Sequence, residues 1–525
     1  MDTKGIIENK LRAYGQEQLL TFWDELSDEQ KAFLEAEINR VDFEQIQRLF
    51  EHRNDVPESS QMAYRCSEPV SFRLSDLRER VDSPPFPNSQ YDPYEAREIG
   101  EGMLRHGRIA AAVVAGGQGT RLDFPHAKGF YPIGPLSNAS LFQIHVERIR
   151  AVARKYNTRI PFLIQTSPAT HDETITFFRE HKNFGLPDED VLIFCQGTMP
   201  SVRFEDGKIF LREKWEVAKS PDGHGGFLAC ANAPAPDAWS EKSREEGVLA
   251  DMESRGIEEI FYFQIDNPII DIASPEFIGY HMLSRSEFSS QVVRKVHPKD
   301  RVGNMVMVDG RLHVIEYSDL PDDAGARRKP DGSLEIWAGS IAVHMMNVKF
   351  LRAKANLAGS LPFHIAKKKV PFVVTSPEEG APVGTHIKPE SPNAIKFEKF
   401  IFDLLPQANN PIVVEIDAST GFAPLKNHDR VPTDNPTTTR AGLSNLYKLW
   451  LNNMGIQLAD GVIVEVSPLF ANSAAELRDR LLAEGMWPKD NLITESVYWH
   501  ELGRGKNRCV VIFGFAFSRW RFFAG

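Results

Sequence analysis

IAAAVVAGGQGTRLDFPHAKG, which occupies residues 109–129, is the most informative stretch of this 525-residue chain. Its first seven residues are apolar, with the length and Val/Ala content of a strand that is buried on both faces. The glycines that follow let the backbone turn sharply and come close to a ligand. Their exposed N–H groups, with Arg121 and Lys128 beside them, favour the binding of a polyphosphate. The stretch therefore predicts a nucleotide site at the carboxyl end of the first strand of an α/β sheet.

Two commoner glycine motifs do not fit this loop. A phosphate-binding P-loop requires Gly, four residues and then Gly-Lys-Ser/Thr, a string that does not occur in this sequence. A dinucleotide fingerprint that started at Gly117 would require Gly or Ala where the chain has Leu122. One that started at Gly116 fails at Gln118. The two cations of the loop also distinguish it from a redox dinucleotide site, which relies on backbone amides and a helix end.

The composition is that of an ordinary globular protein of two or three domains, with 42% apolar and 25% charged residues. The net charge is −11 and no basic block occurs, which argues against nucleic-acid binding. The sequence shows no apolar leader and no uninterrupted run of 18 apolar residues, so we expect a cytoplasmic protein without a membrane partner. Cys66, Cys195, Cys230 and Cys509 form no metal-type CxxC pair, and we expect the middle two to be buried thiols rather than a disulfide.

Along the chain we distinguish an N-terminal helical segment (1–95), a central catalytic domain (96–455) and a small C-terminal region (456–525). In the central domain, apolar runs alternate with segments rich in helix formers, which is typical of parallel strands joined by helical crossovers. Residues 303–317 instead predict a β-hairpin that turns at Asp309-Gly310 and leans over the carboxyl edge of the sheet. The expected strands are 109–115, 161–165, 191–195, 260–265 and 412–416, and a helix is expected from Pro436 to about Asn453.

The N-terminal segment is expected to supply packing surface rather than chemistry. Ser27-Asp28-Glu29-Gln30 predicts a capping box, and the helix that it opens should bury Phe33, Leu34 and Ile38. A Pro-rich stretch, residues 83–94, is predicted to link this segment to the central domain.

Several short blocks of sequence, spread in order over roughly residues 10–470, support a family assignment. The first is GGQGTRL followed by Lys128-Gly129, which is similar to the signature of sugar nucleotidyltransferases. The others are QTS at 165–167, QGTMP at 196–200, SPDGHGG at 220–226, QIDN at 264–267, IEYS at 315–318, PNAIKFEKF at 392–400, PLKN at 424–427 and DNPTT at 434–438. Together they resemble the eukaryotic-type UDP-sugar pyrophosphorylases, and among these the UDP-N-acetylglucosamine pyrophosphorylases.

The resemblance implies a Rossmann-like nucleotidyltransferase core with a mixed sheet. The implied reaction is the attack of a sugar 1-phosphate on the α-phosphorus of UTP, which gives a UDP-sugar and pyrophosphate. Such chemistry requires in-line positioning and neutralisation of negative charge. Arg121 would hold the departing pyrophosphate, Lys128 would stabilise the α-phosphate in the transition state, and Lys426 would contact substrate phosphate. The loop departs from the family pattern at Asp123, where Gly is usual, and at Ala127, where Pro is usual.

The contacts with the nucleotide base and ribose are also implied by the resemblance. Gln196 is similar to the glutamine that recognises uracil, and Lys396 would be a further cation at the nucleotide. Gly116, Gly117 and Gly223 would present their backbone to the base and ribose.

Asp266 is the candidate metal ligand. It ends an apolar strand, and a carboxylate at the carboxyl end of a central strand is expected to hold Mg²⁺ between phosphate groups. The alternative is that Asp266 and Asn267 form the N-cap of a helix before Pro268.

At the sugar end, the match to the family is incomplete. Gly303 and Glu316 match positions that touch sugar hydroxyls, but His224 and Ser340 stand where the N-acetylglucosamine enzymes carry Asn. The GHG string at 223–225 is instead similar to the glucose-specific and broad-specificity UDP-sugar pyrophosphorylases. The leading hypothesis is a Mg²⁺-dependent uridylyltransferase that makes UDP-N-acetylglucosamine. The acceptor stays open between the 1-phosphates of N-acetylglucosamine, N-acetylgalactosamine and glucose.

Two further points concern the whole chain. A non-catalytic nucleotide-sugar-binding protein is the hypothesis from another class, and the joint presence of Arg121, Lys128, Asp266 and Lys426 argues against it. Related eukaryotic enzymes carry a longer, β-rich C-terminal domain, whereas residues 473–525 form a short one. We therefore expect either a monomer or a weak dimer.

Overall fold

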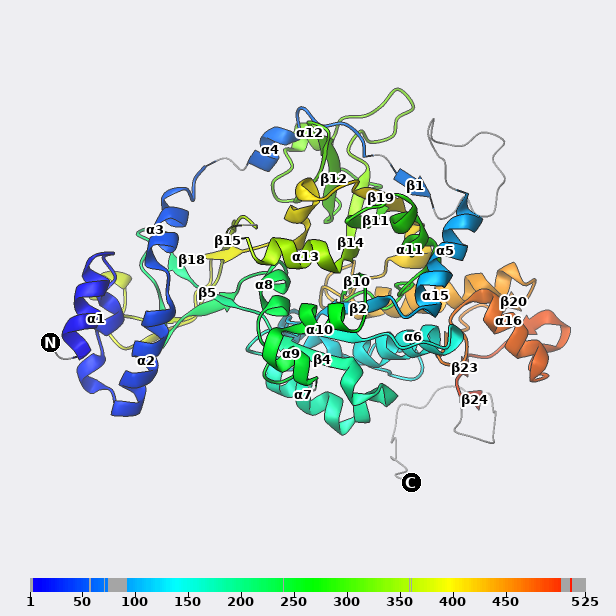
Figure 1. Cartoon of the computed structure of the whole chain (residues 1–525), viewed down its shortest axis with the longest axis horizontal. Coiled ribbons are helices and arrows are strands. Elements are labelled where there is room, and N and C mark those ends of the chain that lie inside the picture. Colours follow the sequence, from blue (N-terminus) through cyan, green and yellow to red (C-terminus); the bar gives the residue numbers. More distant parts are fainter. Residues whose placement is uncertain are drawn as a thin grey trace.

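The computed structural model describes residues 3–55, 58–69, 71–73, 92–238, 240–357, 359, 361–501 and 510–511. A ten-stranded sheet runs through the centre of the molecule, with helices on both faces (Figure 1). The N-terminal helices lie at one end, and the C-terminal elements α16 (Ala474–Ala483) and β23 (Val497–Trp499) lie at the other. None of the described helices is long and apolar enough to cross a membrane.

One half of the sheet is parallel, as the alternation of apolar runs predicts. Its strands, in spatial order, are β10 (Glu259–Gln264), β2 (Ile109–Val114), β3 (Phe162–Thr166) and β4 (Val191–Cys195). All four predicted strands are confirmed to within one residue. Val114 is paired with both Gln264 and Gln165, so the residues that follow β2, β3 and β10 come together at one edge of the sheet.

The other half of the sheet makes it mixed, as expected for the fold class. β14 (Ala338–Asn347) runs antiparallel between β10 and β11 (Phe288–Arg294). The apolar pattern does not predict these two strands, because polar residues interrupt both runs. Beyond β11 lie β19 (Ile412–Glu415), which is predicted, and β1 (Ser71–Arg73), both parallel to their neighbours.

Two apolar cores lie on the two faces of the sheet. The first core lies under α5 (Pro93–Arg105), α6 (Leu141–Lys155), α7 (His171–Glu180), α11 (Pro275–Leu283) and α15 (Pro436–Asn453). The second lies under α8 (Gly226–Asn232), α10 (Val248–Ser254), α13 (Val348–Ala355) and the 3₁₀ segment η9 (Ile401–Gln407). α15 confirms the helix predicted from Pro436 to Asn453, and the Asn435 side chain caps it. Short connecting helices are α4 (Glu58–Met62), α9 (Glu241–Glu246), α12 (Asp322–Gly325) and α14 (Ala418–Gly421).

The N-terminal helices α1 (Thr3–Arg12), α2 (Asp28–Arg40) and α3 (Phe43–Glu51) pack on a small sheet outside the main one (Figure 1). Its strands are β15 (His364–Lys368), β18 (Ala394–Glu398) and β6 (Val202–Arg203), and two-stranded pairs lie nearby: β5 (Thr198–Pro200) with β9 (Lys219–Pro221), β7 (Leu211–Glu213) with β8 (Glu216–Val217), and β16 (Phe372–Val373) with β17 (His386–Ile387).

The capping box at the start of α2 is confirmed. The Ser27 side chain accepts from Gln30 N, and the Gln30 side chain accepts from Ser27 N. Leu34 and Ile38 are buried as predicted, but Phe33 is 48% exposed, so its predicted inward orientation is wrong. Leu34 and Ile38 are four residues apart and share the buried face, whereas Phe33 lies on the helix side next to that face.

The predicted hairpin is confirmed as β12 (Gly303–Val308) and β13 (Arg311–Ile315). Asp309 (φ 49°) and Gly310 (φ 76°) both adopt the left-handed conformation, as a type I′ turn requires. Gly303 is paired with Ser340 of β14, so the hairpin continues the main sheet.

The described part of the C-terminal region packs on the first core, to which Val464, Leu477 and Trp499 contribute. The predicted linker lies mostly outside the described residues, as do Cys509 and most of the chain after residue 501. Cys66, Cys195 and Cys230 are free thiols; Cys195 and Cys230 form no disulfide, as expected, but they are half-buried rather than buried. The C-terminal strands are β20 (Gln457–Leu458) with β22 (Leu492–Ile493), and β21 (Val464–Val466) with β23 and β24 (Val510–Val511).

Candidate functional site

The glycine-rich loop after β2 folds back on itself through its own backbone. Gly119 N donates to His126 O (2.8 Å), and Lys128 N donates to Gly117 O (3.0 Å). Gln118 and Ala127 are paired across the loop in the same way. These bonds return the chain to the end of β2, so that Lys128 lies at the edge of the sheet where the neighbouring strands also end.

The two departures from the family pattern are accommodated in this loop. Asp123 adopts a left-handed conformation (φ 53°), which glycine adopts most easily and Asp adopts more readily than most residues. Ala127 is buried, and its N–H donates to Glu173 Oε1 (2.6 Å). A proline at position 127 could not make this bond, because it has no N–H.

Three cations and one carboxylate meet at this edge. Lys128 Nζ lies 4.0 Å from Asp266 Oδ2, and the exposed fractions of the two side chains are 20% and 11%. Burial lowers the pKa of Lys128; the charge of Asp266 opposes this effect, and the charges of Lys426 and Arg121 add to it. The structure therefore brings together Arg121, Lys128, Lys426 and Asp266, which the sequence places in three separate blocks.

The segment that carries Lys426 is tied to the end of β10. Leu425 N donates to Asp266 O (2.8 Å). The Asn267 side chain donates to Gly421 O (2.8 Å) and accepts from Ala423 N (3.1 Å). No helix begins after Asn267, so the alternative reading of Asp266 and Asn267 as a helix N-cap is wrong.

Asp434 is a charged neighbour of this cluster that sequence reasoning missed as a site residue. Its carbonyl oxygen accepts from the backbone N–H groups of Lys426 (2.7 Å) and Asn427 (2.8 Å). Burial raises the pKa of its carboxyl, the charge of Lys426 lowers it, and that of Asp266 raises it. The DNPTT block that contains it was the available signal.

Asp266 is the residue at this edge of the sheet that could serve as a carboxylate ligand for Mg²⁺. Among the described residues, no three His, Cys, Asp or Glu side chains are grouped so that they could hold a metal ion. Mg²⁺ at phosphate-handling sites is commonly held by one or two carboxylates, with substrate phosphates and water as the other ligands. Asp266, which faces Lys128 at the predicted polyphosphate position, is suited to such a role.

The residues predicted to bind the base lie next to one another. Gln165 Nε2 donates to Gln196 Oε1 (3.1 Å), and Gln196 Nε2 lies 3.5 Å from Gly223 O. Ser167 Oγ donates to Gly116 O (2.7 Å). Gly223 has a φ of +86°, and a Cβ at this position would lie 2.4 Å from Lys399 O, so only glycine fits there.

Gly116 and Gly117 can be separated by experiment. A Cβ at Gly116 would lie 2.9 Å from Gln196 Oε1, whereas a Cβ at Gly117 would meet nothing within 4 Å. Gly116→Ala should therefore displace the Gln196 amide, lower the melting temperature of the free protein and raise the Kd for UTP about tenfold or more. Gly117→Ala should leave the melting temperature unchanged. Equal melting temperatures for the two variants, measured by differential scanning fluorimetry, would contradict this packing argument.

Three of the four residues predicted for the sugar end, Gly303, Glu316 and Ser340, lie close together. A Cβ at Gly303 would lie 3.5 Å from Glu316 Oε1 and 3.7 Å from Ser340 Cβ. Burial raises the pKa of Glu316 to about 7, with the charge of Asp319 as a further cause. Burial also lowers the pKa of His224 to about 3, so this ring is neutral.

Lys396 is the predicted nucleotide residue that does not join the cation cluster. It lies on β18 in the small sheet, and its charged neighbours are Glu398 and Lys368. Sequence reasoning missed His364 and Asp403, which border the sugar end and are not singled out in any block.

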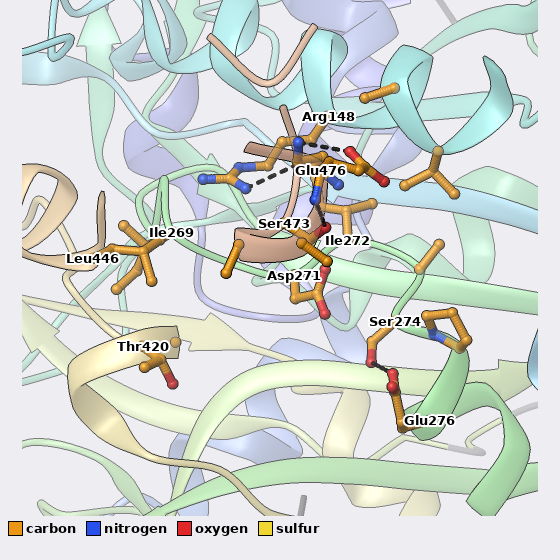
Figure 2. Close-up of a pocket in the computed structure, with 18 of the residues that line it drawn as sticks. Arg148, Ile269, Asp271, Ile272, Ser274, Glu276, Thr420, Leu446, Ser473 and Glu476 are labelled. Atoms are coloured by element: carbon orange, nitrogen blue, oxygen red, sulfur yellow. Dashed lines mark hydrogen bonds between the residues drawn. The ribbon is translucent and has the colours of Figure 1, made fainter. Parts of the chain in front are cut away.

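A separate cavity of about 660 Å³ lies between α6, α15, the start of α16 and the segment after β10 (Figure 2). Arg148, Asp271 and Thr420 are among the residues on its wall. None of the site residues predicted from the sequence, all of which are described, lines this cavity. Gly421, whose carbonyl oxygen accepts from the Asn267 side chain, is also on its wall.

Comparisons with known proteins place the chain in a family and support its fold. Residues 91–431 match the family described as UTP–glucose-1-phosphate uridylyltransferase. The chain is 35% identical over 464 residues to UDP-N-acetylhexosamine pyrophosphorylase-like protein 1 of Xenopus tropicalis, covering 85% of this chain and 84% of the relative. It is 31% identical over 469 residues to UDP-N-acetylglucosamine pyrophosphorylase of Saccharomyces cerevisiae, covering 86% and 92%. The crystal structure of the uridine diphosphate N-acetylglucosamine pyrophosphorylase of Trypanosoma brucei has the same fold, with a TM-score of 0.75 at 23% identity over 94% of this chain and 98% of that one.

Proposed function

Because the chain belongs to the UTP–glucose-1-phosphate uridylyltransferase family, we propose that it transfers a uridylyl group from UTP to N-acetylglucosamine 1-phosphate. The products are UDP-N-acetylglucosamine and pyrophosphate. The name of the yeast relative supports N-acetylglucosamine 1-phosphate as the acceptor, and that of the Xenopus relative supports an N-acetylhexosamine. The observation that carries the proposal is the position of Lys128 at the edge of the sheet, 4.0 Å from Asp266 and within the electrostatic influence of Lys426 and Arg121.

The proposed mechanism assigns a separate task to each cation. Arg121, in the glycine-rich loop, binds the pyrophosphate that departs, since its planar guanidinium matches two phosphate oxygens. Lys128 is mostly buried and faces the α-phosphate, where negative charge spreads in the transition state. Lys426 holds the phosphate of the incoming sugar. A protein that only bound nucleotide sugars would not need this arrangement around the reacting phosphorus.

Asp266 is the residue that would hold Mg²⁺. A bound magnesium ion would neutralise charge on the triphosphate and help to fix its geometry. The Asp266 carboxylate also balances part of the charge of Lys128, from which it lies 4.0 Å. The backbone carbonyl oxygen of Asp266 accepts from Leu425 N and so holds the neighbouring Lys426 segment in place.

The two residues that replace asparagine at the sugar end retain hydrogen-bonding capacity. Ile401 N donates to His224 Nδ1 (3.3 Å), so the neutral ring carries its proton on Nε2. His224 Nε2 and the Ser340 hydroxyl are therefore both donors, as an asparagine amide is. On this basis the site can bind an N-acetylated sugar without the usual asparagines.

The first test measures pyrophosphate release from UTP and Mg²⁺ with three acceptors, the 1-phosphates of N-acetylglucosamine, N-acetylgalactosamine and glucose. We expect kcat/KM to favour N-acetylglucosamine 1-phosphate over glucose 1-phosphate by about tenfold or more. A preference for glucose would make His224 and Ser340 a specificity switch and support the alternative, a UDP-glucose or broad-specificity enzyme. No release with any acceptor, together with a shift in melting temperature on adding UTP, would indicate a non-catalytic binding protein.

The raised pKa of Glu316 predicts how kcat/KM for the sugar 1-phosphate depends on pH. Its pKa is raised to about 7, so the carboxyl is ionised above this pH and can then accept bonds from two sugar hydroxyls. Below pH 7, kcat/KM for the sugar 1-phosphate should fall by about tenfold per pH unit. Glu316→Gln should remove this limb and lower kcat/KM at high pH by about 10- to 100-fold. The sugar 1-phosphate itself titrates near pH 6, so the difference between variant and wild type is the quantity to measure.

A further inference from the structure

A histidine–aspartate pair borders the proposed sugar site and has no role in the mechanism above. His364 begins β15 and is paired with Glu398 of β18. Its Nε2 lies 2.7 Å from Asp403 Oδ2, in the first turn of η9. The exposed fractions of the two side chains are 28% and 17%. The pair is therefore held in a defined geometry, unlike most ion pairs on a protein surface.

A stack of rings connects this pair with the sugar-binding loop. The centroids of the His364 and Phe400 rings are 4.4 Å apart, and those of Phe400 and His224 are 5.1 Å apart with an interplanar angle of 19°. Ile401, the residue after Phe400, donates the backbone bond that fixes the tautomer of His224. A substitution of His364 should therefore alter the position of the His224 ring through Phe400.

Charges from several elements act on the pair. Burial alone would lower the pKa of His364, but the hydrogen bond and charge of Asp403 outweigh burial, and the charges of Asp319 and Glu316 add to the increase. In the other direction, the positive charges of His364 and Lys426 partly offset the burial that raises the pKa of Glu316. The other titratable groups near the pair are His224, His313 and Glu398.

We propose that His364, held by Asp403, is a positioning residue for the sugar 1-phosphate: it supports the Phe400–His224 stack and directs a positive charge at Glu316. This inference rests on the proposed function, because His224 and Glu316 contact a sugar only if a sugar binds there. A ring that is already held in place loses little freedom when the sugar binds, and a cation near Glu316 keeps this carboxylate available as an acceptor.

Two variants of the full chain separate the stacking from the charge. His364→Phe keeps an aromatic ring beside Phe400 but removes the charge, whereas His364→Asn removes both. We expect the KM for N-acetylglucosamine 1-phosphate to rise about tenfold or more in His364→Asn and by less in His364→Phe, with the KM for UTP within about twofold of wild type in both.

The pH profile provides a readout that a purely structural role would not move. Loss of the His364 charge removes an effect that lowers the pKa of Glu316, so this pKa should rise further in both variants. The acid limb of kcat/KM for the sugar 1-phosphate should move to higher pH by about half a unit or more. In a Glu316→Gln background, His364→Phe should produce no such shift, because the titrating group is gone.

His386→Asn is the matched control. His386 Nε2 also faces a carboxylate, Glu213 Oε2 at 3.5 Å, but it lies on β17, away from the proposed sugar site, and is 59% exposed. This variant should keep the wild-type KM values and pH profile. Melting temperatures of all variants show whether the fold is retained.

The outcomes distinguish a failure of the proposed function from a failure of the inference about His364. An inactive wild type with every sugar 1-phosphate would overturn the proposed function and this inference with it. An active wild type whose His364 variants keep both the KM for the sugar and the position of the acid limb would overturn the inference alone. Equal increases in KM for UTP and sugar, accompanied by a lower melting temperature, would show that His364 only supports the fold.

Discussion

Lys128→Ala should lower kcat about 10³-fold while the Kd for UTP changes by less than about fivefold. The ammonium group lies 4.0 Å from Asp266 and is mostly buried, so its interaction with the α-phosphate is poorly screened by water. This interaction should strengthen as charge moves onto the phosphate in the transition state. Single-turnover rates and equilibrium titration with UTP measure the two quantities separately.

The stability of the same variant provides an independent check. Burial and the charges of Lys426 and Arg121 lower the pKa of Lys128, so the charged amine is unfavourable in the protein without substrate. Lys128→Ala should therefore melt at the same temperature as wild type or at a higher one. Lys155→Ala is the control, since Lys155 pairs with Glu476 at 2.9 Å outside the site. Losses of equal size in kcat and UTP affinity would instead make Lys128 a ground-state anchor.

The part of the site that follows the parallel strands could be predicted from the sequence. β2 is a continuous apolar run, β10 is apolar between Glu259 and Gln264, and the carboxyl ends of adjacent parallel strands meet at one edge. Asp266 follows β10 closely, and the folded-back loop after β2 returns Lys128 to the same edge, so their proximity follows from the strand topology together with the loop. Gly303 and Ser340 are close for a different reason, the pairing of β12 with β14, which depends on a strand that the apolar pattern does not predict.

The residues that could not be predicted depend on contacts between distant segments. His364 and Asp403 are 39 residues apart and meet because β15 and η9 converge beside Phe400. Asp434 lies in the DNPTT block, but its position beside the cluster depends on the bond from Lys426 N to its carbonyl oxygen, which the block alone does not predict. The exposed orientation of Phe33 could not be predicted either, because the apolar pattern of a short helix does not specify its buried face to within one residue.

Asp266→Asn should lower kcat/KM about 10³-fold and raise the Mg²⁺ concentration needed for half-maximal rate. The substitution keeps the size of the side chain and leaves the main-chain bond from Leu425 N to Asp266 O intact, so the segment that carries Lys426 should stay in place. What it removes is the negative charge of Asp266, which raises the pKa of Lys128. The pKa of Lys128 should therefore fall further, and the alkaline limb of the rate should move to lower pH.

These two effects separate metal binding from charge balance. Loss of a metal ligand changes the Mg²⁺ dependence, whereas loss of charge balance changes the alkaline limb at saturating Mg²⁺. Asp434→Asn is the matched comparison, because Asp434 also lies near Lys426 but burial raises its pKa, and it is not a cause of the shift at Lys128. We expect this variant to lose less than about tenfold in kcat/KM and to keep the wild-type Mg²⁺ dependence. If Asp266→Asn also kept that dependence while the alkaline limb moved, Asp266 would be a counter-ion for Lys128 and the magnesium ion would be held by substrate alone.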